Sequence, residues 1–350
     1  MSKSPGAQRV GVALIGAGMI AQTHVAALSA AQDRVRLISI ISRHPEKAKY
    51  LAKYYAGPTP SFSADLASVV DNPEIHMVIV ATPPSVRASL IEPLAMAGKH
   101  ILLEKPVART TGEAEDVVDI CERAGVKLGM LFQHRVQESS QAAQRYVAGG
   151  ELGRLGHVEI EAPLWRDQSY YDELGRGTYE RDGGGVLMTQ AIHTINLALS
   201  LAGPVARVQA MTATSPLHQM EAEDFAVAGL QFVCGAVGSL VASTASFPHG
   251  KEVIKLHFER GSLHLGRTSL DLVWRSGVRE TVVVDKGDLG EAGPVVTTHG
   301  LHLGVIEDFV EAIQNNRAPL VSGRDALETH RLIEAIEMSS RTGRGMDVPV

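Results

Sequence analysis

The sequence is poor in cysteine and aromatic residues and carries no excess of positive charge. Cys121 and Cys234 are the only cysteines in 350 residues, too few for a disulfide framework, and no Cys and His spacing matches a metal knuckle. The formal net charge is −6, which argues against nonspecific binding to nucleic acid or to an anionic membrane. No apolar run reaches the roughly 18 to 20 residues that span a bilayer, and the first ten residues lack the plan of a secretory signal. We therefore expect a cytoplasmic protein without a metal that binds neither nucleic acid nor membrane.

The length and the order of the apolar patterns predict two domains. A chain of 350 residues is long for a single core. Its first third alternates strand and helix patterns, which is typical of an α/β, doubly wound parallel sheet, the Rossmann fold. The expected strands are 10–15, 35–41, 77–81, 100–104 and 126–132, and the expected helices are 19–31, 45–54, 85–97 and 110–124. We assign residues 1–130 to a dinucleotide-binding domain.

The rest of the chain has a different pattern. Residues 205–285 hold closely spaced segments in which apolar and polar residues alternate, as expected for a large open, mostly antiparallel sheet. Two helix patterns, at about 303–315 and 325–340, close the chain. We therefore expect residues 131–350 to form an α+β domain for substrate binding and oligomerisation.

A glycine-rich turn follows the first predicted strand. Gly16 and Gly18 stand in the segment Gly-Ala-Gly-Met-Ile-Ala, and Met19 and Ile20 open a helix pattern. A strand, a tight turn and a helix N-terminus in this order cradle a dinucleotide pyrophosphate, because the glycines let the backbone approach the phosphates. The alternative is an ordinary glycine turn in an unrelated α/β domain.

A lysine ends another predicted strand. Glu104, Lys105 and Pro106 stand at the carboxyl end of a parallel strand, where open α/β sheets bind ligands. Lys105 can act as a base near neutral pH only if burial and a neighbouring cation lower its pKa from about 10.4. The alternative is a Lys–Glu pair that merely ends the strand.

A histidine lies in a helix pattern that follows three glycines. His193 follows Gly183-Gly184-Gly185 and stands four residues after Thr189, so both side chains project from one side of a helix. A histidine on a helix next to a loop that allows close approach suits proton transfer. The alternative is a buried structural histidine.

Taken in order, these segments resemble the Gfo/Idh/MocA oxidoreductase family, named for glucose-fructose oxidoreductase, inositol dehydrogenase and a rhizopine-catabolism protein. The features that carry the resemblance are the glycine turn, Thr82-Pro83 after the strand at 77–81, Glu104-Lys105-Pro106, and the triple glycine before His193. The resemblance implies that Lys105, joined to Pro106 by a bond that is often cis, lies by the nicotinamide, and that His193 contacts the substrate hydroxyl. It implies an NAD(P)-dependent dehydrogenase that transfers a hydride between the cofactor and a secondary hydroxyl or carbonyl of a sugar, polyol, sugar acid or nucleotide-linked sugar. A homodimer or homotetramer is also implied.

Two positions depart from this family's pattern. Thr189 stands where many members carry Asp and some carry Asn, and a hydroxyl stabilises a protonated imidazole less than a carboxylate does. His193 is therefore expected to act mainly as a hydrogen-bond donor, and Lys105 is the stronger candidate for the base. Arg87 stands where many members carry His, and we interpret this position as peripheral.

The choice of cofactor depends on the end of the second strand. An acidic residue there would bind the ribose 2′-hydroxyl and select NAD. The chain instead has Ser42, Arg43 and His44, with Lys47 one turn later, and Arg43 could pair with a 2′-phosphate. We favour NADP over NAD, the alternative being a solvated basic turn. The rest of the expected cofactor site comprises Gly16, Gly18, Met19, Ile20, Thr82, Pro83, Glu104 and Lys105.

Two segments are candidates for substrate binding. Gln133, His134 and Arg135 follow the last strand of the first domain, and Trp165 and Arg166 begin a stretch that also holds Tyr170 and Tyr171. Aromatic faces suit a sugar ring and Arg suits a carboxylate or phosphate, although the aromatic residues could equally pack between sheet and helices. Two other functions remain open: a dinucleotide-binding sensor without turnover, and an aldose–aldose oxidoreductase that retains its NADP.

Overall fold

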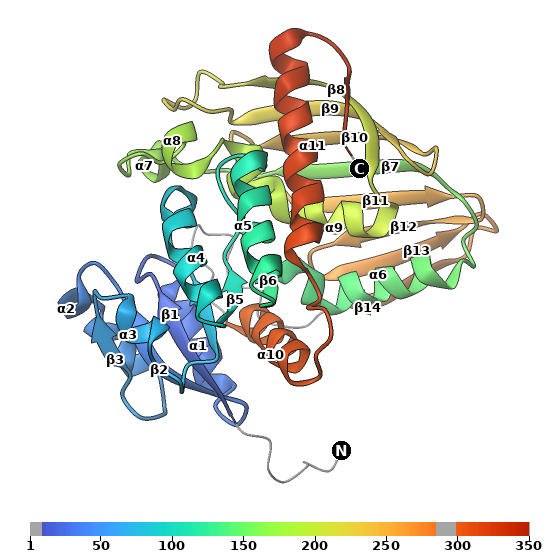
Figure 1. Ribbon diagram of the computed structural model, residues 1–350. Coiled ribbons are helices and arrows are strands. Elements are labelled where there is room, and N and C mark those ends of the chain that lie inside the picture. The colour runs from blue at the N-terminus through green and yellow to red at the C-terminus, as the bar shows by residue number, and fades with distance from the viewer. Residues whose placement is uncertain (1–8, 285–298, 350) are drawn as a thin grey trace. The chain divides into compact units, whose positions relative to one another are not determined.

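The computed structural model describes residues 9–284 and 299–349, which form two compact units (Figure 1). The first unit holds the described residues up to Ala108, then Glu115–Gln133, then those from His299 to Gly323. The second holds Arg109–Ala114, the residues from His134 to Val284, and those from Arg324 onward. The chain therefore crosses between the units several times, whereas the sequence predicts a single boundary near residue 130.

The first unit is built on six parallel strands in the order β3-β2-β1-β4-β5-β6. Their bounds are β1 (Val10–Ile15), β2 (Val35–Ile41), β3 (Ser61–Ser63), β4 (Met77–Val80), β5 (His100–Leu103) and β6 (Leu128–Met130). Every residue of β1 and β4 is buried, as expected of strands covered on both faces. This strand order is that of doubly wound dinucleotide-binding sheets, which bind ligands at the carboxyl ends where the order reverses, here between β1 and β4. The predicted Rossmann fold is confirmed.

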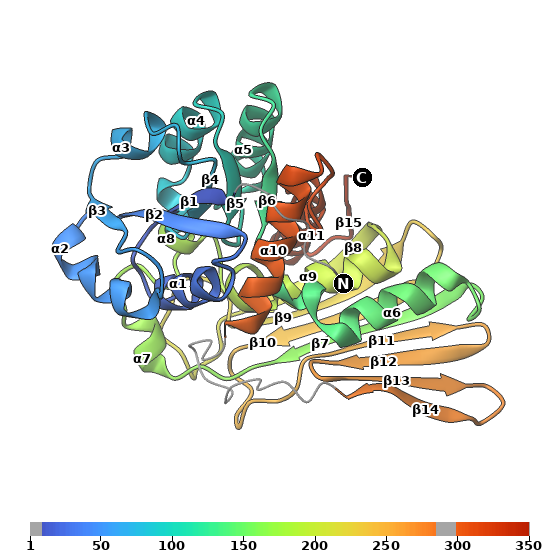
Figure 2. The ribbon, with the colours of Figure 1, turned by 90° about the horizontal axis from the view of Figure 1, so that it is seen from below.

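Helices lie on both faces of this sheet. Helix α1 (Ala21–Ala30) covers one face, and α3 (Ala67–Val70) and α4 (Ala88–Met96) cover the other (Figure 2). The unit also contains α2 (Pro45–Ala48), the 3-10 helices η1 (Lys49–Tyr54) and η2 (Pro84–Val86), the larger part of α5 (Thr111–Arg123), and α10 (Gly300–Gln314). Helix α10 comes from far along the chain and packs against α1. Its His302 therefore reaches the core of the first unit.

The second unit contains a nine-stranded sheet in the order β14-β13-β12-β11-β7-β10-β9-β8-β15. The strands are β7 (Leu155–Pro163), β8 (Val205–Ala213), β9 (Phe225–Phe232), β10 (Val237–Ser243), β11 (Val253–Phe258), β12 (Gly261–Gly266), β13 (Ser269–Trp274), β14 (Arg279–Val284) and β15 (Met346–Asp347). Strand β7 is parallel to β10, and the other neighbouring pairs are antiparallel. The predicted mostly antiparallel sheet is therefore confirmed, although β7 lies outside the predicted range.

Three long helices, α6 (Glu138–Gly149), α9 (Ile192–Ala202) and α11 (Gly323–Thr342), lie on one face of this sheet (Figure 2). Shorter elements are η3 (Gln133–Val136), α7 (Gln168–Tyr171), α8 (Tyr179–Asp182) and η4 (Leu187–Ala191), a π-helical turn that leads into α9. The stretch Tyr179–Ala202 is long and apolar enough to span a membrane, but 83% of its most apolar window is buried within the fold. The stretch comprises α8, η4 and α9, and most of it lies in the core of this unit.

The opposite face of the large sheet is polar at its centre and apolar beside it. Across β7 and β11, Glu159 Oε2 and Lys255 Nζ lie 2.7 Å apart. Val237 and Val241 on β10 and Met211 on β8, two strands further along the sheet, are 53%, 39% and 54% exposed. Among the described residues, Figure 2 shows no helix over the middle of this face.

Candidate active site

The glycine turn after β1 has the geometry of a phosphate cradle. Gly16 has a φ of +109°, and a Cβ built there would lie 2.7 Å from the carbonyl oxygen of Ala81, so a side chain is excluded. A Cβ on Gly18 would meet nothing within 4 Å, which leaves open space in front of α1. Ala21 is fully buried, which permits the close packing of α1 on the sheet. The turn therefore fits a dinucleotide pyrophosphate at the N-terminus of α1.

The basic segment after β2 lies beside this turn. The Gly16 N–H donates to the Ile41 carbonyl at 2.8 Å, so the carboxyl ends of β1 and β2 are adjacent. Arg43, His44 and Lys47 are exposed. The acidic Glu46 also lies here, with its Oε1 3.6 Å from His44 Nδ1, so its nearest described cation is His44. Arg43 supplies the guanidinium of this segment, which can contact an adenosine ribose.

Residues expected at the cofactor also follow β4 and β5. Thr82 and Pro83 follow β4, and Thr82 Oγ1 is buried with no hydrogen-bond partner in the described part of the chain. An orphaned hydroxyl at a strand end suits a bound polar group. The next strand, β5, ends at Glu104-Lys105-Pro106, and the Lys105–Pro106 bond is cis. Glycine turn, Thr82 and Lys105 thus share the carboxyl edge of one sheet.

Two buried histidines determine the charge state of Glu104. His24 Nε2 lies 2.9 Å from Glu104 Oε1, and His302 Nε2 lies 3.8 Å from the same oxygen. Burial acts to raise the pKa of Glu104, but the hydrogen bond from His24 and the charges of His24, His302 and Lys105 outweigh it and lower this pKa to about 2. Burial and the charge of His24 lower the pKa of His302 to about 4. Glu104 is therefore an ionised acceptor, and its Oε2 also accepts the Lys105 N–H at 3.2 Å.

These three side chains also have the spacing of a possible metal site. The ligand atoms of His24, Glu104 and His302 lie within 4.8 Å of one another. The 2.9 Å between His24 and Glu104 is nevertheless a hydrogen-bond distance, shorter than the roughly 3.3 Å between ligands of a tetrahedral ion with bonds near 2.0 Å. The geometry is that of a hydrogen-bonded pair.

The interpretation of Arg87 as peripheral is wrong. Its side chain is only 2% exposed, and it donates to the carbonyl oxygens of Thr82, Glu104 and Pro106. Burial lowers the pKa of Arg87 to about 10, so the guanidinium remains charged at neutral pH. Arg87 therefore contacts the two segments that we expect beside the nicotinamide, the chain at Thr82 and the chain at Glu104-Lys105-Pro106.

In the second unit, the buried carboxylate of Glu223 lies at the start of the helical segment that carries His193. Glu223 accepts the N–H groups of Gly185 and Leu187 at 3.0 Å each. A Cβ on Gly185 would lie 1.8 Å from the Glu223 carbonyl oxygen, so glycine is required there. Burial raises the pKa of Glu223, against the effect of these N–H donors. The triple glycine thus allows the segment that precedes β9 (Phe225–Phe232) to approach and cap this helix closely.

Thr189 and His193 do not share a regular α-helical turn. Thr189 lies in the π-helical turn η4, and its Oγ1 donates to the Gly185 carbonyl at 2.7 Å. His193 is the second residue of α9, is 8% exposed, and lies against His134 with ring centroids 4.9 Å apart and the rings tilted by 33°. A π-turn widens the helix and re-aims the residues that follow it, which is common at functional sites.

Most of the predicted substrate residues gather around the same helix. Arg135 Nη1 lies 3.4 Å from Asn196 Oδ1, one turn after His193, and burial lowers the pKa of Arg135. Arg166 Nη2 donates to Gln190 Oε1 at 2.7 Å. Gln190, immediately before Ala191 in η4, also donates to the Tyr170 hydroxyl at 3.0 Å. Gln133 lies at the start of η3, in the first unit.

Sequence reasoning missed the pair that supports Trp165 and Arg166. His218 Nδ1 lies 2.8 Å from Asp224 Oδ2, and His218 Nε2 lies 2.8 Å from the Arg166 carbonyl oxygen. Both His218 and Asp224 are almost completely buried. The ring of Trp165 lies 5.7 Å from that of His218. His218 and Asp224 are only six residues apart, but His218 is 52 positions from Arg166, so no local spacing predicts that the pair supports Arg166.

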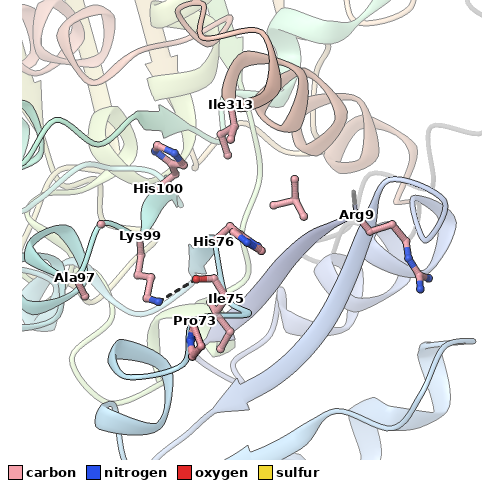
Figure 3. Close-up of a pocket in the computed structure, with 10 residues that line it drawn as sticks. Arg9, Pro73, Ile75, His76, Ala97, Lys99, His100 and Ile313 are labelled. Carbon is pink, nitrogen blue, oxygen red and sulfur yellow. Dashed lines mark hydrogen bonds between the residues drawn. The ribbon is translucent and has the colours of Figure 1, made fainter. Parts of the chain in front are cut away.

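A pocket of about 430 Å³ in the first unit lies at the other end of the strands (Figure 3). It is lined by Arg9, His76, Lys99, His100 and Ile313, next to the first residues of β1, β4 and β5. Lys99 Nζ donates to the carbonyl oxygens of Asn72 and Ile75 at 2.7 and 3.0 Å, so its ammonium is bound within the fold. This pocket includes none of the predicted site residues.

Comparison with known proteins identifies the family. Residues 10–132 match the family model for an oxidoreductase family with an NAD-binding Rossmann fold, and residues 140–264 match the GFO/IDH/MocA C-terminal domain. The chain belongs to the Gfo/Idh/MocA family of oxidoreductases. The resemblance inferred from Glu104-Lys105-Pro106 and the glycine-led helix is therefore confirmed.

Relatives of this Gfo/Idh/MocA protein match it over nearly its whole length. It is 26% identical to a levoglucosan dehydrogenase of Pseudarthrobacter phenanthrenivorans, over 98% of this chain and 99% of that one, and 26% identical to a D-apiose dehydrogenase of Paraburkholderia graminis, over 96% and 89%. Among solved structures, the WlbA dehydrogenase from Bordetella pertussis with NADH and UDP-GlcNAcA is 28% identical, with a TM-score of 0.81 and coverage of 98% and 100%. Levoglucosan dehydrogenase with NADH and levoglucosan is 25% identical, with a TM-score of 0.85 and the same coverage. The chain is an oxidoreductase with an NAD-binding fold.

Proposed function

We propose that this enzyme oxidises a secondary hydroxyl of a carbohydrate-like substrate, namely a sugar, polyol, sugar acid or nucleotide-linked sugar, or reduces the corresponding carbonyl. The observation that carries the proposal is the position of Lys105 at the carboxyl end of β5, on the same sheet edge as the glycine turn. The relatives named above act on or bind sugars and a nucleotide-linked sugar acid, which supports this substrate class.

The residues of this chain have separate roles in the proposed reaction. The turn at Gly16 and Gly18 binds the pyrophosphate through backbone N–H groups at the start of α1. The bound nicotinamide supplies the hydride acceptor. Lys105 Nζ accepts the proton of the substrate hydroxyl, and Glu104 holds the Lys105 backbone through Oε2. His193 donates a hydrogen bond that positions the substrate. Thr189 is the third candidate for the proton-transfer site, and because its hydroxyl donates to the Gly185 carbonyl it would take part as a hydrogen-bond acceptor.

The cofactor we favour is NADP. Ser42 and Arg43 occupy the position at which an acidic residue would select NAD, and Arg43 is exposed with no hydrogen bond or ion pair among the described residues. A free guanidinium beside the adenosine ribose can pair with a 2′-phosphate. The related structures contain NADH, so the preference is proposed for this chain alone.

The enzyme is further proposed to act in the cytoplasm as a homodimer or homotetramer through the open face of its large sheet. Exposed Val237, Val241 and Met211 on that face support an interface, because apolar side chains grouped beside polar pairs are typical of one. Light scattering on the purified protein distinguishes these states, and a monomer at micromolar concentration would contradict the proposal.

A coupled absorbance screen tests the function itself. Purified enzyme is incubated with NAD or NADP and a panel of sugars, polyols, sugar acids and nucleotide-linked sugars, and reduced cofactor is measured at pH values from 7 to 10. We expect turnover with at least one class. Protein that binds a dinucleotide but reduces none across the panel would instead support a sensor, and NADP retained through purification would support an aldose–aldose oxidoreductase.

A further inference from the structure

Arg87 connects two segments that are distant in the sequence. Its Nε and Nη2 donate to the Thr82 carbonyl at 3.1 and 2.7 Å. Its Nη1 donates to the carbonyls of Glu104 and Pro106 on the neighbouring strand end. A single guanidinium therefore holds the chain after β4 and the chain after β5 in one arrangement.

The position of this cation is unusual in one respect. Arg87 is 2% exposed, yet none of the hydrogen bonds described for it goes to a carboxylate. Within the described part of the chain, carbonyl oxygens accept its hydrogen bonds, and the charge of Glu104 also offsets the cost of burying the guanidinium. A buried cation whose hydrogen bonds go to backbone carbonyls restrains the path of that backbone.

The backbone it holds includes the residues on both sides of Lys105. Arg87 binds the carbonyl before Lys105 and the carbonyl after it, while the Glu104 carboxylate binds the Lys105 N–H at 3.2 Å. Lys105 is thus fixed through three main-chain groups. A fixed backbone limits where its Nζ can lie.

We propose that Arg87 is a positioning residue for Lys105, and that its guanidinium keeps the Thr82 and Lys105 segments in register for proton transfer. This inference rests on the proposed role of Lys105 as proton acceptor. Lysine cannot replace Arg87 in this role, because an ammonium is a compact donor whereas the guanidinium presents donors on two sides of a plane. Arg87→Lys is therefore the informative variant, and Arg87→Met removes all the donors.

The matched control is Arg36→Met. Arg36 lies on β2 of the same sheet and pairs with Glu74 at the surface, where the two side chains are 38% and 63% exposed. Loss of that pair removes a guanidinium from the same unit without touching the chain after β4 or β5. We expect the Arg36→Met enzyme to match the parent enzyme in its amide hydrogen-exchange rates, its kcat and its dissociation constant for NADH.

The test combines hydrogen exchange without cofactor, NADH binding and kinetics. In Arg87→Lys we expect exchange of the Lys105 amide at least tenfold faster, kcat at least tenfold lower, and a Kd for NADH changed less than threefold. A folded Arg87→Lys with parental exchange and kcat would overturn the inference. So would loss of folding in both Arg87 variants, since Arg87 would then be structural only. If Lys105→Met keeps its turnover, the proposed proton acceptor fails, while the exchange result still reports on the link made by Arg87.

Discussion

Glu337 on α11 lies beneath the triple-glycine turn and gives a sharp prediction about stability. A Cβ on Gly184 would lie 3.3 Å from Glu337 Oε1, and this oxygen is buried with no hydrogen-bond partner among the described residues. Burial, followed by the charge of Glu223, raises the pKa of Glu337 from 4.5 to about 8. The folded protein therefore holds a proton that the unfolded chain releases near pH 4.5.

The sign and size of the effect follow from this difference. Between pH 4.5 and 8 the folded state binds more protons than the unfolded state, so the free energy of unfolding falls as pH rises. The interval from 4.5 to about 8, at about 1.4 kcal/mol per pKa unit, corresponds to an upper value of about 5 kcal/mol. Because Glu337 is partly exposed, we expect about 3 kcal/mol. Glu337→Gln removes this penalty.

Urea unfolding at pH 5, 7 and 9 measures the difference in the free energy of unfolding between Glu337→Gln and the parent protein. The variant should exceed the parent in stability by less than about 1 kcal/mol at pH 5 and by about 3 kcal/mol at pH 9. Glu151→Gln, an exposed position in the same unit, is the control and should leave the pH dependence unchanged. A constant difference between Glu337→Gln and the parent across this range would refute the reasoning.

Three other variants test the two units. Gly16→Ala forces a Cβ to within 2.7 Å of the Ala81 carbonyl at a φ of +109°, so it should cost about 2 kcal/mol or more of stability and abolish NADH binding, which calorimetry measures. Arg43→Ala should weaken NADP binding at least about tenfold while NAD binding changes little, and equal effects would contradict the cofactor proposal. His218→Ala leaves the Asp224 carboxylate buried without its histidine, so thermal and chemical unfolding should show a loss of about 3 kcal/mol, and a loss below about 1 kcal/mol would show that the pair is not a support.

The sequence predicted the parts of the fold that depend on local pattern. Strand β2 (Val35–Ile41) has the predicted bounds, and the Gly16 turn, the strand end at Lys105 and the glycine-led helix of His193 all lie where the spacing indicated. Such features are visible because a strand, a turn or a helix cap depends on residues a few positions apart. Strand β7 was missed, although Val158, Ile160 and Ala162 alternate on its buried side, because it precedes the region where several such segments cluster.

Long-range contacts could not be predicted. Nothing near His302 indicates that α10 returns to α1 and meets His24, with ring centroids 5.1 Å apart. The interpretation of Arg87 as peripheral rests on a family pattern, and only the folded chain shows that its guanidinium binds the carbonyls of Glu104 and Pro106. Residues that come into contact only through the tertiary fold have no fixed spacing in the sequence.

The most direct test of the central claim is the Lys105→Met enzyme, assayed with the substrate class and cofactor identified by the screen. We predict that kcat falls at least about a hundredfold, because a general base is lost, while the Kd for NADH measured by fluorescence changes less than about threefold. Turnover within about tenfold of the parent enzyme would contradict the assignment of Lys105 as the proton acceptor.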